Sequence, residues 1–293
     1  MSRIQIQKTY KIFIDGKFPR TESARYYPVY NSKKELLANM CLSSRKDFRN
    51  AVVAARKAFP SWSSKTHFNR SQILYRIGEM LETRKVQFIE EIMLLGKTKA
   101  AAEKEINLSI DRCIYYAGWC DKYQQVFSSV NPVSSSHFNF SVCEAMGVIS
   151  IIGDEKNALL DVISTLLPAI AGGNTVVFLA SEKLPLCAIS FAEVLATSDL
   201  PSGVVNIITG KEDELFSQFA NHMDVNAVVY GKENKTIKKE IQALSSQNVK
   251  RFFDWNKDWI KDENENPYLI LDLQEIKTTW HPIEDIATSA GKY

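Results

Sequence analysis

The strongest constraint on the fold is a run of short apolar segments, separated by single helix-length segments, between residues 147 and 230. Each apolar segment is continuous rather than alternating, which is typical of strands buried on both faces of a parallel sheet. The predicted strands are Gly147–Ile152, Thr175–Leu179, Val204–Ile208 and Ala227–Tyr230, with helices near residues 158–170, 185–197, 212–220 and 235–244. This pattern predicts a Rossmann-like α/β unit.

The part of the chain before residue 123 has the texture of amphipathic helices. Apolar residues recur at intervals of three and four, which predicts helices at residues 44–59, 73–81, 86–95 and 100–123. Pro60 is expected to end the first of these, and Gly96 the third. Ahead of them, Asp15-Gly16 within Lys11–Pro19 predicts a small β-hairpin.

Two further segments read as strands that are only half buried. Val126–Val130 and His137–Val142 alternate around Asn131-Pro132, which predicts a second hairpin. Near the C-terminal end, the polar run Lys261–Asn266 predicts a loop before one last strand within Pro267–Trp280.

Composition excludes several classes of function. The 293 residues include 36 basic and 34 acidic side chains, a net charge of only +2, which argues against a nucleic-acid-binding surface. The sequence has no long apolar run for a membrane span and no secretory signal, so a cytoplasmic protein is expected. Its five cysteines are scattered, without metal-ligand spacing, and are expected to be buried reduced thiols.

Several stretches of this sequence, spread over nearly the whole chain, resemble the aldehyde dehydrogenase superfamily. They are Phe13–Lys17, Ala51–Trp62, Tyr115–Lys122, Leu167–Val177 and Leu200–Gly210. The resemblance implies an aldehyde dehydrogenase-like Rossmann domain with N-terminal helices. It also implies a small β sheet for oligomerisation, which the last strand would complete.

The same resemblance implies a division of the chain into four sections. Residues 1–122 would form the N-terminal hairpin and helical part of the cofactor-type domain, and residues 146–258 its Rossmann-like part. Residues 123–145 would be the oligomerisation hairpin and residues 267–283 the oligomerisation strand. In the family a catalytic domain lies between the last Rossmann elements and that strand. Only about a dozen residues stand there, whereas an independent domain needs about 50, so the catalytic domain is expected to be absent.

The catalytic groups that the family resemblance implies are also altered. The family's nucleophile is a cysteine of the catalytic domain, but no cysteine follows Cys187. The family's oxyanion-binding asparagine would align with Lys156, with Asn157 one position late. Asp154 is expected instead to cap the helix that follows, and Asp254, near the place of the family's general base, to end a strand. We therefore predict no catalytic residues and no metal site.

The residues that would hold a nicotinamide cofactor are partly retained. Ser181 and Glu182 match the family's ribose-binding run, but Leu179 replaces its lysine. Gly231 matches the first glycine of the pyrophosphate-binding turn, whereas the second glycine position carries Lys235 or a neighbour. We interpret Ser181, Glu182 and Gly231 as a vestigial cofactor site and expect no cofactor.

These observations favour a non-catalytic aldehyde dehydrogenase-like protein, a pseudoenzyme. It would act as a structural or regulatory subunit that oligomerises with itself or with a complete aldehyde dehydrogenase. The alternative is an NAD- or NADP-binding oxidoreductase acting on aldehydes, with an unusual or partner-supplied nucleophile. A third reading is a degenerate protein without a selected role. Titration with NAD and NADP separates the first two hypotheses.

Overall fold

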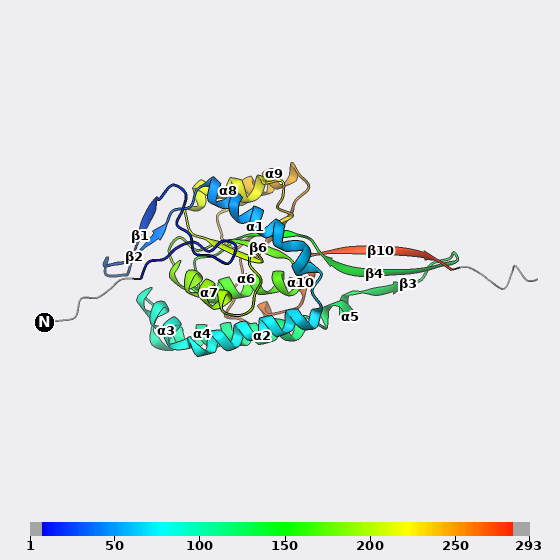
Figure 1. The fold of residues 1–293 in the computed structure, drawn as a ribbon, viewed down its shortest axis with the longest axis horizontal. Helices are drawn as coiled ribbons and strands as arrows, with labels where there is room; N and C mark the ends of the chain where they lie inside the picture. The colour runs from blue at the N-terminus through cyan, green and yellow to red at the C-terminus, as the bar shows by residue number, and fades with distance from the viewer. Residues whose placement is uncertain (1–7, 284–293) are drawn as a thin grey trace, which may run out of the picture.

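A parallel five-stranded sheet forms the centre of the molecule (Figure 1). The structure is a computed structural model that describes residues 8–283. The strand order is β7-β6-β5-β8-β9, so the chain winds outward in both directions from β5. The strands are β5 (Val148–Ile152), β6 (Thr175–Leu179), β7 (Val205–Ile208), β8 (Ala227–Tyr230) and β9 (Arg251–Asp254). The predicted Rossmann-like unit is confirmed, and Asp254 is the last residue of its strand.

Helices cover both faces of this sheet. On one face lie α1 (Arg45–Ser63), α8 (Glu212–Asn221) and α9 (Lys235–Ser246). The other face carries α6 (Leu160–Ala171) and α7 (Leu186–Ala196). A further layer packs outside α6 and α7 and consists of α2 (His67–Thr83), α3 (Lys85–Leu94) and α4 (Lys99–Trp119). The described residues form no helix that is both long and apolar enough to cross a bilayer.

The predicted end of the first helix at Phe59 is wrong, because α1 continues through Pro60 to Ser63. Proline removes one helical hydrogen bond at a cost of about 3 kcal/mol. Tertiary contacts offset this cost in the final turn. Trp62 is fully buried there, and its indole Nε1 donates to the carbonyl of Ile170 at 3.1 Å.

The N-terminal segment is joined to the sheet by one short bridge. Phe13 pairs with Ile207 of β7, and the turn at Asp15-Gly16 has positive φ at both residues, as predicted for a tight hairpin. A hairpin that the sequence patterns did not predict follows it. Its strands are β1 (Tyr26–Tyr30) and β2 (Leu36–Cys41), paired antiparallel.

A second sheet projects from the body of the molecule (Figure 1). It has the order β10-β4-β3, all antiparallel, and comprises β3 (Ser129–Asn131), β4 (His137–Ala145) and β10 (Gln274–Pro282). The predicted union of the hairpin with the last strand is confirmed. Two details are corrected, because Val126-Phe127 belongs to the helix α5 (Tyr123–Phe127) and Tyr268–Asp272 is the helix α10. Buried Tyr123, Leu269 and Ile270 anchor these short helices to the body.

The segment between β9 and β10 takes the place that a catalytic domain would occupy. It contains a single turn of 3-10 helix at Asp262–Asn264 and the short α10. Trp255 and Trp259 are buried in it, and the Trp255 indole donates to Asp272 at 3.2 Å. Buried tryptophans therefore fix this connection against the body of the molecule.

Candidate functional site

The candidate site is a cavity of about 330 Å³ between the turns that follow β5 and β8. These two strands are neighbours at the point where the order of the sheet reverses, the usual place for a ligand in an open α/β sheet. Asp154–Lys156 line one side of the cavity and Gly231–Asn234 the other. Glu212, at the start of α8, and Asn256, just beyond β9, complete the lining.

Lys232 lies between two carboxylates in this cavity. Its ammonium Nζ is 3.1 Å from Glu155 Oε1 and 3.0 Å from Glu212 Oε2. Burial alone would lower the pKa of Lys232, but Glu212 and Glu155 together hold it above the usual lysine value. The other oxygen of Glu212 accepts a hydrogen bond from the Tyr230 hydroxyl at 2.8 Å. The ammonium is thus neutralised by the chain itself.

Two aspartates are buried together beneath the same turn. Asp161 Oδ2 accepts the backbone N–H of Asp154 at 3.0 Å, and both side chains are about 1% exposed. Burial raises the pKa of Asp161 well above the usual aspartate value, and the nearby Asp154 raises it further. Burial also raises the pKa of Asp154. One oxygen of each carboxyl group has no hydrogen-bond partner among the described residues. The pair therefore favours a protonated form in the folded protein.

The prediction that Asp154 caps the next helix is wrong. The N-cap position of α6 is Leu159, and the free backbone N–H groups of Leu159 and Leu160 donate to Oε1 of Glu105, at 2.8 and 3.3 Å. Glu105 belongs to α4 and is buried. An acceptor from a distant helix takes over the capping role, which local sequence rules do not anticipate.

The three predicted vestigial cofactor residues have different surroundings in the structure. The hydroxyl of Ser181 accepts the backbone N–H of Leu184 at 3.0 Å, which closes the turn after β6. A Cβ built on Gly231 would lie 3.1 Å from the backbone N of Asp154 and 3.2 Å from the carbonyl oxygen of Ile152. Glu182 is half buried and outside the cavity lining. The structure thus places Gly231 at the cavity but not Ser181 or Glu182, and their role toward a cofactor stays a prediction.

Three large side chains that could fill a cofactor groove are buried. Leu179, Tyr230 and Trp255 are each at most 2% exposed. Lys156, at the position that the resemblance assigned to an oxyanion-binding asparagine, is instead held by Asn256 at 2.6 Å and Glu233 at 3.4 Å. The cavity is therefore lined by charged groups that already pair with one another.

The burial of the cysteines bears on whether one of their thiols could act as a nucleophile. All five cysteines are free, and all except Cys41 are buried. Burial raises the pKa of Cys120 to about 12 and that of Cys187 well above the usual thiol value. A thiol with a raised pKa is a poor nucleophile at neutral pH, because the thiolate is the reactive form. Within residues 8–283, no group of metal-binding side chains is found either.

Comparison with known proteins gives one consistent result. The chain is 31% identical over 251 residues to the aldehyde dehydrogenase homologue DhaS of Bacillus subtilis (strain 168), covering 84% of this chain and 50% of DhaS. It is 27% identical over 257 residues to cytosolic 10-formyltetrahydrofolate dehydrogenase of Mus musculus, covering 86% of this chain and 28% of that protein. Among solved structures, an NAD+ complex of aldehyde dehydrogenase from Bacillus cereus superposes with a TM-score of 0.79 at 27% identity, over 84% of this chain and 50% of that one.

This chain therefore spans half or less of the length of these curated relatives. The half that it shares is the Rossmann-like part, and the catalytic domain is absent from the described residues. The model of the aldehyde dehydrogenase family matches residues 18–253, and the chain belongs to the aldehyde dehydrogenase family.

Proposed function

We propose that this protein is a non-catalytic member of its family, a structural or regulatory subunit that oligomerises through the sheet β10-β4-β3. Its partner is a second copy of this chain or a complete aldehyde dehydrogenase. The observation that carries the proposal is this sheet itself. It extends from the body with a nine-residue pairing between β10 and β4, although the domain that would share the chain with it is missing.

The register of the sheet gathers several exposed apolar side chains on one of its faces. Directly paired residues of antiparallel strands lie on the same face, so the pairings of Val130 with Phe140, Phe140 with Thr279 and Phe138 with His281 place these side chains together. The rings of Phe138 and Phe140 are 5.5 Å apart. Val130 is 67% exposed and Phe138 46%. An apolar face exposed to this degree is typical of an interaction surface.

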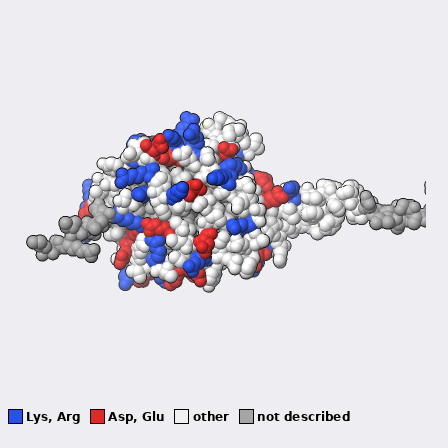
Figure 2. Space-filling view, in the orientation of Figure 1, with Lys and Arg blue, Asp and Glu red and all other residues white. Residues whose placement is uncertain are grey.

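The absence of charge on the projecting part of this sheet supports the same function. Residues 129–143 and 278–283 contain no Lys, Arg, Asp or Glu, and the projecting part is correspondingly uncharged in Figure 2. The charged residues of the three strands, Glu144, Glu275 and Lys277, lie where β4 leads into β5 and where β10 begins. Protein–protein interfaces are depleted of charge at their centres, whereas a solvated sheet carries charges to prevent association.

The cavity between β5 and β8 supports a role without a nicotinamide cofactor. A dinucleotide would bring its anionic pyrophosphate against Asp154, Glu155, Glu212 and Glu233, where the only cationic groups are Lys156 and Lys232. Both lysines already pair with these or neighbouring groups. The residues present do not fit the pyrophosphate, because its binding would require breaking these pairs. We derive no redox step through this site.

Light scattering coupled to size-exclusion chromatography tests the oligomeric role. We expect the protein to elute as an oligomer, alone or when co-expressed with a complete aldehyde dehydrogenase, and Phe138→Asp to abolish that association. Val86→Asp is the matched control, since Val86 is 70% exposed on α3, away from the sheet. A strictly monomeric protein that never co-elutes with the complete enzyme would defeat the proposal.

Isothermal titration with NAD and NADP independently tests the proposed lack of a nicotinamide cofactor. We expect no saturable heat at millimolar cofactor. Saturable micromolar binding would contradict the proposed lack of cofactor and favour an oxidoreductase.

We also propose a cytoplasmic location. All five cysteines are free thiols, as expected for a protein in a reducing compartment.

A further inference from the structure

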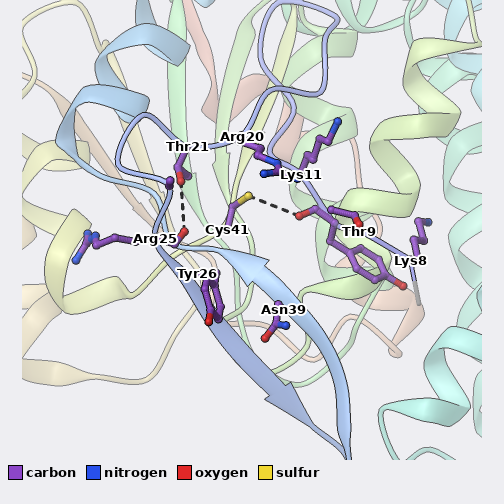
Figure 3. Close-up of a pocket in the computed structure, with 11 residues that line it drawn as sticks. Lys8, Thr9, Lys11, Arg20, Thr21, Arg25, Tyr26, Asn39 and Cys41 are labelled. Carbon is purple, nitrogen blue, oxygen red and sulfur yellow. Dashed lines mark hydrogen bonds between the residues drawn. The ribbon is translucent and has the colours of Figure 1, made fainter. Parts of the chain in front are cut away.

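A second cavity, at the end of the molecule opposite the projecting sheet β10-β4-β3, has an unusual lining. Figure 3 shows it between the N-terminal segment, the loop before β1 and the strand β2, with a volume of about 290 Å³. Four cations line it, Lys8, Lys11, Arg20 and Arg25, and no described residue of the lining is acidic. The whole chain carries a net charge of only +2, and both signs are interspersed over the body in Figure 2. The cavity is thus a local concentration of positive charge.

Two of these cations are compensated by carboxylates outside the cavity. Arg25 pairs with Glu214 at 2.8 Å, and Lys8 pairs with Glu193 at 3.0 Å. These contacts fix two sides of the lining to α8 and α7. Lys11 and Arg20 are then the cations of the lining that could bind an anionic ligand.

Lys11 and Arg20 have no carboxylate within ion-pair distance among residues 8–283. Both line the same cavity as Cys41, and Figure 3 shows the three side chains. Hydroxyl and amide groups of Thr9 and Asn39 add hydrogen-bond donors to the lining. Two cations that line one cavity match the two charges of a phosphate, and the guanidinium fork with further donors matches its several oxygens.

We propose that this cavity is a binding site for a small phosphate monoester or inorganic phosphate, held by Lys11 and Arg20. Its volume suits a small metabolite, since pockets for drug-sized ligands begin at about 300 Å³. Charge-assisted hydrogen bonds to Arg20 and the ammonium of Lys11 supply the affinity. The compensated pairs of Lys8 and Arg25 hold the walls in place. This site is independent of the proposed oligomeric role.

Cys41 provides a reporter inside the cavity. It is the only cysteine that is not buried, and its thiol donates to the carbonyl of Tyr10 at 3.6 Å on the cavity wall. We expect alkylation of Cys41 by the neutral reagent iodoacetamide to slow as inorganic phosphate is added at constant ionic strength. Mass spectrometry of the labelled peptides identifies the modified cysteine. Unchanged alkylation at saturating phosphate would overturn the proposal.

Calorimetric titration with inorganic phosphate and with phenyl phosphate distinguishes the two possible ligands, free phosphate and a phosphate monoester. Tighter binding of phenyl phosphate indicates a monoester, and equal binding indicates phosphate itself; both support the site. We expect the double variant Lys11→Gln/Arg20→Gln to weaken binding by about tenfold or more, as lost charge-assisted hydrogen bonds do.

The matched control is Arg45→Gln/Lys57→Gln, which removes the same charge from exposed positions of α1. We expect it to bind like the parent protein. If both double variants weaken phosphate binding equally, the effect comes from net charge alone, and a site at this cavity is refuted. The absence of saturable binding to the parent protein would refute it as well. Far-ultraviolet circular dichroism and thermal unfolding of each variant establish that it is folded.

Discussion

The guanidinium of Arg112 and the carboxylate of Glu265 lie 3.2 Å apart, and this pair fastens the shortened connection to the body of the molecule. Arg112 belongs to α4 and is almost fully buried, and it also donates to the carbonyl of Trp259 and to the hydroxyl of Ser164. Trp259 and Glu265 both lie in the segment that stands in place of a catalytic domain. One arginine of the helical layer therefore holds this connection at two points, Trp259 and Glu265.

The contributions of the two partners are expected to differ. Burial raises the pKa of Glu265 despite the nearby Arg112. The negative charge of this carboxylate therefore contributes little to the free energy of unfolding. Glu265→Gln keeps an acceptor and should lower the free energy of unfolding by less than about 1 kcal/mol. Arg112→Met leaves the buried acceptors of Trp259 and Ser164 without a donor and should cost about 3–5 kcal/mol. Urea unfolding measures both; equal losses would contradict this account.

The buried aspartate pair predicts a pH dependence of stability. Because burial raises the pKa of Asp161, the folded protein keeps a proton that the unfolded chain releases above its ordinary value of 3.8. The free energy of unfolding should therefore fall as the pH rises above about 4, by up to about 1.4 kcal/mol per pH unit for each such proton.

The variant Asp161→Asn retains an oxygen for the Asp154 N–H but removes the titrating group. It should be more stable than the parent at pH 7 and show a flatter pH profile between pH 4 and 8. Asp111→Asn, at an exposed position of α4, is the control and should leave the profile unchanged. A parent protein whose stability rises over this interval would show the opposite sign and refute the prediction.

The lysine in the candidate cofactor cavity is expected to be structural. Lys232→Met leaves the buried carboxylate of Glu212 without a cation and leaves Glu155 with Lys183 alone, at a cost of about 3 kcal/mol. The double variant Lys232→Met/Glu212→Gln should recover part of this loss, because the unpaired charge is removed. Urea unfolding of both variants checks the coupling. A double variant less stable than Lys232→Met would show that the unpaired charge is not the cause.

The central fold was predictable because its signals are local. Continuous apolar strands such as Thr175–Leu179 and the stop at Gly96 depend on residue type and spacing alone, and both are confirmed. The errors occurred where a distant contact overrides a local rule. Pro60 stays within a helix because Trp62 is anchored on Ile170, and Asp154 does not cap α6 because Glu105 reaches across from α4.

The sites were less predictable than the fold for the same reason. The position of Gly231 next to the β5 turn follows from the strand order, in which β8 pairs with β5. The ion pairs of Lys232 join the turns after β5 and β8 to the first residue of α8, and no spacing in the sequence predicts them. The cavity around Lys11 and Arg20 is formed in part by β1 and β2, a hairpin that the sequence patterns did not predict.

The packing of Gly231 gives a test that separates a structural glycine from a cofactor-binding one. A methyl group at this position would approach the backbone N of Asp154 at 3.1 Å and the Ile152 carbonyl oxygen at 3.2 Å, closer than ordinary contacts. Neither is the end of a flexible side chain, so the turn after β5 would have to shift. Gly231→Ala should therefore lower the free energy of unfolding by about 1–3 kcal/mol.

Gly118→Ala provides the contrast within the same protein. Gly118 lies in α4, where an added Cβ meets only the ammonium of Lys122 at 3.8 Å. There the substitution should stabilise the protein by about 0.5–1 kcal/mol, since alanine favours the helix. Thermal and urea unfolding without any nucleotide measure both variants. If Gly231→Ala is as stable as the parent, the glycine is not held by the contact with the β5 turn, and a ligand becomes the better explanation for it.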